Sequence, residues 1–162
     1  MIGLVEKLYR TCDLTDDELA ALIGTDDKEA AELLKRRADE VCRREYGSKV
    51  YLRGLIEISS YCRNDCFYCG IRRSNSDAER YRLSHEEILA CCENGYGLGF
   101  RTFVLQGGED GSFNDDVMCG IISDIRAKFP DCAITLSLGE RSRSSFERMK
   151  NAGADRYLLR HE

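Results

Sequence analysis

The sequence lacks the features that direct a protein to a membrane, to export or to nucleic acid. No apolar run approaches the ~20 residues that a membrane-spanning helix requires. Residues 1–7 lack the basic segment and the long apolar core of a secretory signal. The net charge of −5 gives no electrostatic reason to bind nucleic acid or an anionic membrane. We therefore expect a cytoplasmic protein that has neither nucleic acid nor a membrane as a partner.

Motifs of several common enzyme classes are also missing. The chain has no Walker phosphate loop and no Ser-His-Asp arrangement. It does have nine cysteines. In a reducing compartment, clustered cysteines are more often metal-binding or catalytic than disulfide-bonded.

Three cysteines form one tight cluster with the spacing C-x3-C-x2-C: Cys62, Cys66 and Cys69. Iron–sulfur clusters are held by cysteine sulfur, and three thiolates on a four-iron cluster leave one iron without a protein ligand. An open position on a metal can bind and activate a substrate. Structural zinc sites are instead closed by four ligands, and no nearby His or fourth Cys completes such a set. The spacing therefore favours an open iron–sulfur site, with a zinc site or a chance cluster as the alternatives.

An aromatic residue, Tyr68, stands just before the third cysteine, and this pattern resembles the signature of radical S-adenosyl-L-methionine (SAM) enzymes. The longer string at 56–73, IEISSYCRNDCFYCGIRR, resembles FeFe-hydrogenase maturases of the HydE type, which are relatives of biotin synthase and methylornithine synthase. The resemblance implies a 4Fe–4S cluster on the three cysteines and SAM on the open iron. It also implies reductive cleavage of SAM to a 5′-deoxyadenosyl radical, in maturation of the hydrogenase active-site cluster.

The same resemblance implies several partners. They are a small-molecule or organometallic substrate, an electron donor such as ferredoxin or flavodoxin, and other hydrogenase maturases. Two alternatives remain open. One is a sister enzyme of the biotin synthase or methylornithine synthase kind, and the other is an iron–sulfur or metal-binding module without catalysis.

Residues 1–48 are expected to form an N-terminal helical extension. The Thr15–Glu18 pair is a capping-box pattern that opens a short helix, and a longer helix follows over 27–46. Residues 49–162 alternate between strand and helix patterns, with strands expected at 50–58, 102–106, 133–138 and 155–160. Such alternation predicts an α/β fold with a parallel sheet and outer helices.

A closed eight-stranded barrel takes ~250 residues, so the pattern predicts the N-terminal half of a (β/α) TIM-type barrel, and the resemblance implies that it is a radical SAM barrel. An open, doubly wound sheet is the alternative architecture. Because the sequence stops as the fourth strand ends, we expect a truncated barrel with an unpaired edge. Such a chain is expected to aggregate or dimerise and to have little activity alone.

Ligand groups gather at the carboxyl ends of parallel strands. After the second expected strand the chain reads Gln106, Gly107, Gly108 and Glu109. The glycines let the backbone approach a ligand closely, and the glutamate can accept a hydrogen bond from an ammonium group. In context this segment resembles the radical SAM motif that contacts the amino group of SAM; an ordinary turn is the alternative.

Polar residues also end the third and fourth strands. Thr135 and Ser137 share one face, where they either line a pocket or face solvent. Because side chains alternate along a strand with a period of two, Arg160 and Glu162 are expected on the same face. An arginine can hold the SAM carboxylate in a bidentate fork. The resemblance implies that Ser137, Arg160 and Glu162 belong to the SAM and substrate site. A surface salt bridge is the alternative for the last two.

The cysteines outside the cluster are interpreted as packing residues, because free Cys behaves as a small hydrophobe. Cys42 falls on the apolar face of the expected helix at 27–46, and Cys91 and Cys92 are assigned to packing in the helix that Ser84 opens. Cys119 and Cys132 are assigned structural roles as well.

Overall fold

The computed structural model describes residues 1–160 and divides the chain into two compact units, one spanning Met1–Tyr51 and the other beginning at Leu52. No helix in the described part of the chain is both long and apolar enough to cross a membrane.

The first unit consists of three helices, α1 (Ile2–Thr11), α2 (Asp16–Ile23) and α3 (Lys28–Tyr46). The predicted capping box opens α2: the Thr15 hydroxyl accepts from the Glu18 amide at 3.3 Å, and the Glu18 carboxylate accepts from the Thr15 amide at 2.9 Å. The buried core of this unit is small and consists of Val5, Leu22 and Ala30.

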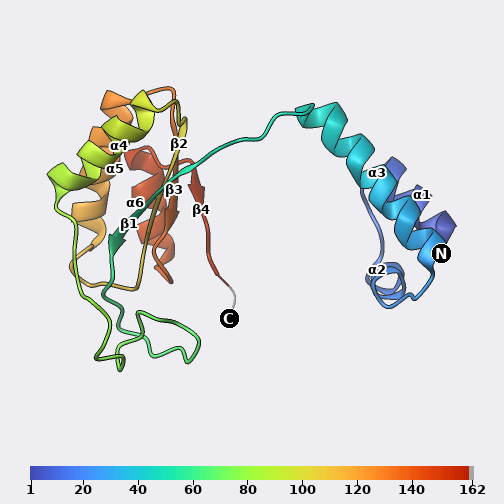
Figure 1. The fold of residues 1–162 in the computed structure, drawn as a ribbon, viewed down its shortest axis with the longest axis horizontal. Helices are drawn as coiled ribbons and strands as arrows, with labels where there is room; N and C mark the ends of the chain where they lie inside the picture. The colour runs from blue at the N-terminus through green and yellow to red at the C-terminus, as the bar shows by residue number, and fades with distance from the viewer. Residues whose placement is uncertain (161–162) are drawn as a thin grey trace. The chain divides into compact units, whose positions relative to one another are not determined.

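The second unit alternates strands and helices (Figure 1). Its elements are β1 (Gly54–Ser59), α4 (His85–Gly97), β2 (Thr102–Gly107), α5 (Asp115–Lys128), β3 (Ala133–Ser137), α6 (Arg143–Ala152) and β4 (Arg156–Tyr157). The four strands are parallel and lie in the order β1-β2-β3-β4. This confirms the predicted parallel α/β unit, and the order lacks the reversal that defines a doubly wound sheet.

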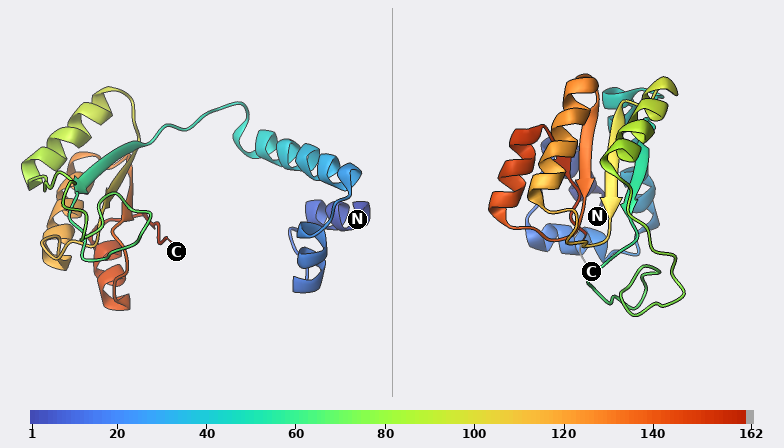
Figure 2. Two further views of the ribbon diagram at one scale, coloured as in Figure 1. Left: turned by 60° about the horizontal axis from the view of Figure 1, so that its bottom comes forward. Right: turned by 90° about the vertical axis from the view of Figure 1, so that its left-hand side faces the viewer.

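One face of the sheet forms the core with helices α4, α5 and α6, which lie beside it in Figure 2. The strands contribute alternate residues to that face, including Ile56, Ile58, Leu105, Ile134 and Leu136, as the strand period of two requires. The helices contribute Ile88, Cys92, Met118, Ile121, Ile122, Ile125 and Met149. On the other face, Leu55 and Glu57 of β1 remain exposed.

Two strand boundaries differ from the prediction. The first strand begins at Gly54 and not at residue 50, because β1 pairs only with β2 and that pairing starts at Gly54 opposite Phe103. Val50 is consequently exposed. The fourth strand is reduced to Arg156–Tyr157, since it pairs on one side only and with just two residues of β3.

Two cysteine predictions are wrong. Cys42 is exposed, because it lines an open apolar groove between α1 and α3. In α4 the inward positions are taken by Ile88, Cys92 and Gly95. Cys91 therefore lies on the outer side of the helix and is exposed. Cys92 and Cys132 are buried in the core as expected, and Cys119 packs against the core while partly buried.

Candidate functional site

Two loops meet at the carboxyl edge of the sheet. The cysteine loop (residues 60–78) follows β1, and the Gly-Gly-Glu loop (residues 107–110) begins at the last residue of β2. They lie side by side because β1 and β2 are paired neighbours, with Ser59 opposite Gly107 at the end of the ladder. The two sequence motifs, about forty residues apart in the chain, are therefore brought together by the sheet.

Gly108 is the point of closest approach between the two loops. A Cβ atom at this position would lie 2.3 Å from the Tyr61 carbonyl oxygen and 2.6 Å from the Cys62 Cβ, so no side chain fits without displacing backbone. The contact is also hydrogen-bonded. The Glu109 amide donates to Cys62 Sγ at 3.4 Å, and the Arg63 amide donates to the Glu109 carbonyl at 3.1 Å.

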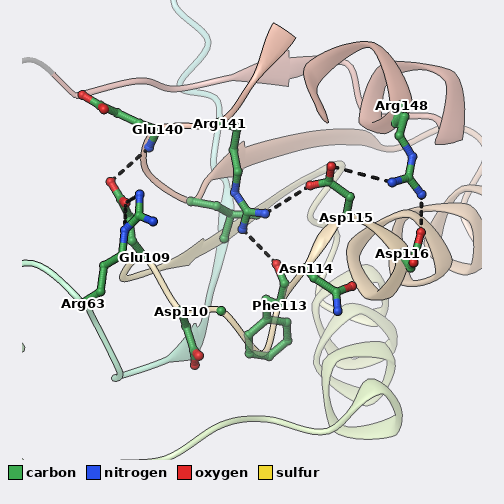
Figure 3. Close-up of a pocket in the computed structure, with 12 residues that line it drawn as sticks. Arg63, Glu109, Asp110, Phe113, Asn114, Asp115, Asp116, Glu140, Arg141 and Arg148 are labelled. Atoms are coloured by element: carbon green, nitrogen blue, oxygen red, sulfur yellow. Dashed lines mark hydrogen bonds and ion pairs between the residues drawn. The ribbon is translucent and has the colours of Figure 1, made fainter. Parts of the chain in front are cut away.

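The Glu109 carboxylate lies inward and is held on both sides (Figure 3). Its Oε2 accepts from Arg63 Nε at 2.7 Å, and its Oε1 accepts from the Glu140 amide at 3.1 Å. Burial opposes ionisation, but the hydrogen bonds from Glu140 and Arg63 outweigh it and leave the pKa of Glu109 below its ordinary value. Glu109 is thus a carboxylate at neutral pH and can accept from a cationic ligand group.

The three loop cysteines are partly buried and carry free thiols. A turn joins two of them, with the Cys69 amide donating to the Cys66 carbonyl at 3.0 Å. Within residues 1–160, no three Cys, His, Asp or Glu side chains lie close enough to hold a metal ion. The donor set nevertheless fits an iron–sulfur cluster, because it offers three thiols, one of which already receives an amide hydrogen bond of the kind that tunes such clusters.

Two buried cysteines outside the cysteine loop have thiols with raised pKa values. Burial raises the pKa of Cys92 to about 12 and also raises the pKa of Cys132. Thiolates are the form that binds metals, so these two thiols are suited to packing and not to ligation.

Tyr68 stays at the surface of the cysteine loop, 66% exposed. Its hydroxyl has no hydrogen bond to a described residue, and its neighbour Phe67 is exposed as well. Tyr68 is therefore joined to the predicted site by its place next to Cys69 and by no hydrogen bond within the described residues.

A polar chain crosses the open face of the sheet. Gln106 Nε2 donates to Glu57 Oε1 at 2.8 Å, and Arg160 Nη2 donates to Gln106 Oε1 at 3.2 Å. Ser137 is buried and stands opposite Gln106 in the β2–β3 ladder. The structure thus groups three predicted residues, Gln106, Ser137 and Arg160, while Glu162 lies outside the described residues.

Glu57 was missed at the sequence level, although it is the one charged residue in the apolar run 55–58 and could have been found on that ground. Thr135 and Ser137 are both buried, so the solvent-facing alternative for them is wrong. The Thr135 hydroxyl has no hydrogen-bond partner within the described chain. An unpartnered buried hydroxyl on this face is suited to meet a ligand group.

Asp110 is a second missed residue, and it directly follows Glu109. Its side chain is 4% exposed and accepts from Arg82 Nε at 2.6 Å, from Arg82 Nη2 at 3.1 Å and from the Ser59 hydroxyl at 2.6 Å. Burial opposes ionisation, but the hydrogen bonds from Arg82 and Ser59 outweigh it and lower the pKa of Asp110. An ion pair between the buried Asp110 and the partly exposed Arg82 therefore anchors the Gly-Gly-Glu loop.

A cleft of about 490 Å³ opens beside Glu109, between the amino end of α5 and the loop before α6 (Figure 3). Charged groups line it in pairs: Arg141 with Asp115, Arg148 with Asp116, and Arg63 with Glu109. Glu140 and Asp110 also line the cleft, so its lining carries more carboxylates than guanidinium groups.

Several known proteins are similar to this chain over almost its whole length. The chain is 42% identical over 159 residues to the [FeFe] hydrogenase maturase subunit HydE of Thermotoga maritima, covering 98% of this chain and 45% of that protein. It is 30% identical to a 3-methylornithine synthase of Methanosarcina acetivorans, and the match covers 97% of this chain and 45% of that protein. A crystal structure of methylornithine synthase superposes with a TM-score of 0.78 at 28% identity, covering 96% of this chain and 46% of that one.

This chain is a relative of the radical SAM enzymes. No protein-family model matches it. The chain spans somewhat less than half the length of these radical SAM relatives. The match covers nearly all of this chain, so it takes in the cysteine loop and the Gly-Gly-Glu loop.

Proposed function

We propose that this protein binds a 4Fe–4S cluster through Cys62, Cys66 and Cys69 and binds SAM beside it, as part of the maturation of an FeFe-hydrogenase. The observation that carries the proposal is the contact at Gly108, which places the Glu109 amide on the Cys62 sulfur. The 42% identity to a hydrogenase maturase subunit supports this reaction over others in the same group.

When bound, the cluster and SAM would supply a one-electron reductive cleavage that yields methionine and a 5′-deoxyadenosyl radical. The residues of the chain hold and orient these groups. The three thiolates would ligate iron and leave one iron open, while Glu109 would accept from the amino group of SAM. Gly107 and Gly108 would contact SAM through their backbone, while the missing side chain of Gly108 leaves room for the cysteine loop to lie against it.

Two further assignments belong to the open face of the sheet. Arg160, already oriented by Gln106, would hold a carboxylate, and the Ser137 hydroxyl would hydrogen-bond to SAM or substrate. Tyr68 and Glu162 are further proposed contacts, carried by the resemblance alone. We also propose a small-molecule or organometallic substrate, an electron donor such as ferredoxin or flavodoxin, other maturases as partners, and the reducing cytoplasm as the compartment.

A sister reaction of the methylornithine synthase kind is the second candidate. The observation in its favour is the superposition on methylornithine synthase, together with 30% sequence identity to a 3-methylornithine synthase. Both candidates require the same cluster and the same SAM site, so they differ in the substrate and not in the residues argued above.

The test is anaerobic reconstitution with iron and sulfide, followed by electron paramagnetic resonance (EPR) of the reduced protein with and without SAM. We expect a four-iron signal that SAM alters and that Cys66→Ala abolishes. Cys91→Ala is the matched control, because it removes an exposed thiol from α4, outside the cysteine loop. A wild-type protein with no cluster, or with a cluster that SAM leaves unchanged, would contradict the proposal.

A further inference from the structure

The segment that returns from the cysteine loop, residues 79–83, is bound along the end of β1. The Ser60 amide donates to the Tyr81 carbonyl at 3.1 Å, and the Leu83 amide donates to the Ile58 carbonyl at 2.9 Å. An antiparallel bridge joins Ser59 to Arg82 between these two bonds. This return segment therefore closes the cysteine loop at its base and carries two arginines, Arg80 and Arg82.

Arg80 binds the backbone of the cysteine loop from both sides of the three cysteines. Its guanidinium donates to the carbonyls of Ser60 at 2.5 Å, Ile71 at 2.8 Å, Arg72 at 2.7 Å and Asn75 at 3.1 Å. The first carbonyl precedes Cys62 and the other three follow Cys69. One cation thus ties together the two ends of the segment that presents the thiols.

The need for such a tie follows from the composition of the loop. Between residues 61 and 78 no residue is buried, so apolar packing does not determine the path of the backbone there. A guanidinium offers five donors in a fixed planar fork, whereas a lysine ammonium offers three on a flexible stem. Only an arginine can satisfy four carbonyls that point at it from different parts of a loop.

Arg82 makes a different set of contacts. It donates two hydrogen bonds to the buried Asp110, the residue after Glu109, and its guanidinium lies 3.7 Å from the centre of the Tyr61 ring. Asp110 in turn accepts from the Ser112 amide at 3.0 Å. Arg82 therefore fixes the Gly-Gly-Glu loop to the base of the cysteine loop, and its one side-chain contact with that loop among the described residues is the ring of Tyr61.

We propose that Arg80 and Arg82 are positioning residues with separate tasks. Arg80 holds the cysteine loop in the conformation that receives the cluster. Arg82, acting through Asp110, holds the Gly-Gly-Glu loop where Glu109 can receive the amino group of SAM. The assignment deepens the proposed function and rests on it for the identity of the two ligands, but the loop-holding contacts themselves can be measured without either ligand.

The test compares Arg80→Lys, Arg82→Lys and Arg73→Lys in the full chain. Arg73 is the matched control because it lies in the cysteine loop, is exposed, and its side chain makes no hydrogen bond to a described residue. Three quantities are measured: amide hydrogen exchange without ligands, the rate of iron loss to a chelator after reconstitution, and the SAM concentration that half-saturates the EPR change.

For Arg80→Lys we expect exchange over residues 60–78 and the rate of iron loss to rise by about tenfold or more, the effect of losing charge-assisted hydrogen bonds. For Arg82→Lys we expect faster exchange over residues 107–113 and an increase of similar size in the half-saturating SAM concentration, with iron loss as in the wild type. Arg73→Lys is expected to match the wild type in all three.

Unchanged exchange in both loops of both variants would overturn the proposal, and so would equal effects of the two variants on iron loss and on SAM. If wild-type protein takes up no cluster, the proposed function fails on its own. The exchange comparison still decides then whether each arginine holds its loop. Lysine preserves the charge at each position, and a thermal unfolding curve for each variant shows whether it is folded.

Discussion

The sheet with its helices and the cysteine loop at its edge are stabilised by different interactions. Core residues such as Leu105 and Ile134 are completely buried and are held by the hydrophobic effect. The cysteine loop has no buried residue between 61 and 78, and hydrogen bonds hold its path, both those that Arg80 donates from outside it and bonds within the loop. Substitutions in the sheet should therefore change stability, and substitutions around the loop should change ligand binding.

The largest effect on stability is expected in the core. Leu105→Ala removes a fully buried side chain from the centre of the sheet and should lower the free energy of unfolding by about 2–5 kcal/mol. Urea denaturation of the protein without ligands measures this. Leu105→Met is the control, since it conserves volume and should cost less than about 1.5 kcal/mol. Equal stabilities for the two variants would mean that the sheet core is not the main stabilising element.

A smaller loss is expected where the two loops touch. Gly108→Ala places a Cβ against the Tyr61 carbonyl and the Cys62 Cβ, so it should cost about 1–3 kcal/mol, the usual range for overpacking. It should also raise the SAM concentration needed to alter the EPR signal, because the loops must separate. Gly111→Ala is the control, since its Cβ would meet nothing within 4 Å. Identical SAM responses in the two variants would contradict the close contact.

The third prediction concerns Asp110 and pH. Asp110→Asn should lower the free energy of unfolding at neutral pH by about 1–3 kcal/mol, because hydrogen bonds to a charged acceptor are lost. Its folded-state pKa lies below the ordinary value, so the stabilisation is present above about pH 4 and is lost as the pH falls through the lowered pKa. Urea midpoints between neutral and acidic pH should converge for wild type and variant, and parallel curves would count against this assignment.

The smallest effect on stability is expected at Arg63, whose side chain is 71% exposed and pairs with the Glu109 carboxylate. Arg63→Gln should change the free energy of unfolding by less than about 1 kcal/mol, as is usual for exposed ion pairs. The SAM concentration for half-saturation should fall, because a cation that competes for Glu109 is removed. A rise in that concentration would show instead that Arg63 assists the binding of SAM.

Much of this arrangement could be predicted from local patterns. The capping boxes at Thr15 and Ser84 open α2 and α4 as expected, since a cap depends only on residues three apart. The periodicity of strands and helices also depends only on residues a few positions apart, and the alternation of the two predicts the parallel sheet. The cysteine spacing and the Gly-Gly-Glu segment likewise indicate the radical SAM relatives before any coordinates are considered.

Contacts between distant residues could not be predicted in this way. The exposure of Cys42 and Cys91 depends on which neighbour covers each helix face, and periodicity alone does not name that neighbour. Glu57, Arg80, Arg82 and Asp110 look like ordinary charged residues in the sequence, and their side-chain partners other than Ser112 lie between 5 and 51 positions away.

The sequence by itself determined the elements, their order and the three thiols, because propensity, capping and ligand spacing act over a few residues. Only the tertiary structure decided that Gly108 meets Cys62, that Arg80 ties the cysteine loop and that Arg82 binds Asp110. The contacts of Gly108 and Asp110 arise from the pairing of β1 with β2, which aligns the ends of both strands at one edge, and Arg80 reaches the cysteine loop because the return segment pairs with the end of β1. Hydrogen bonds at that edge then hold the path of the cysteine loop, because no buried residue between 61 and 78 does so.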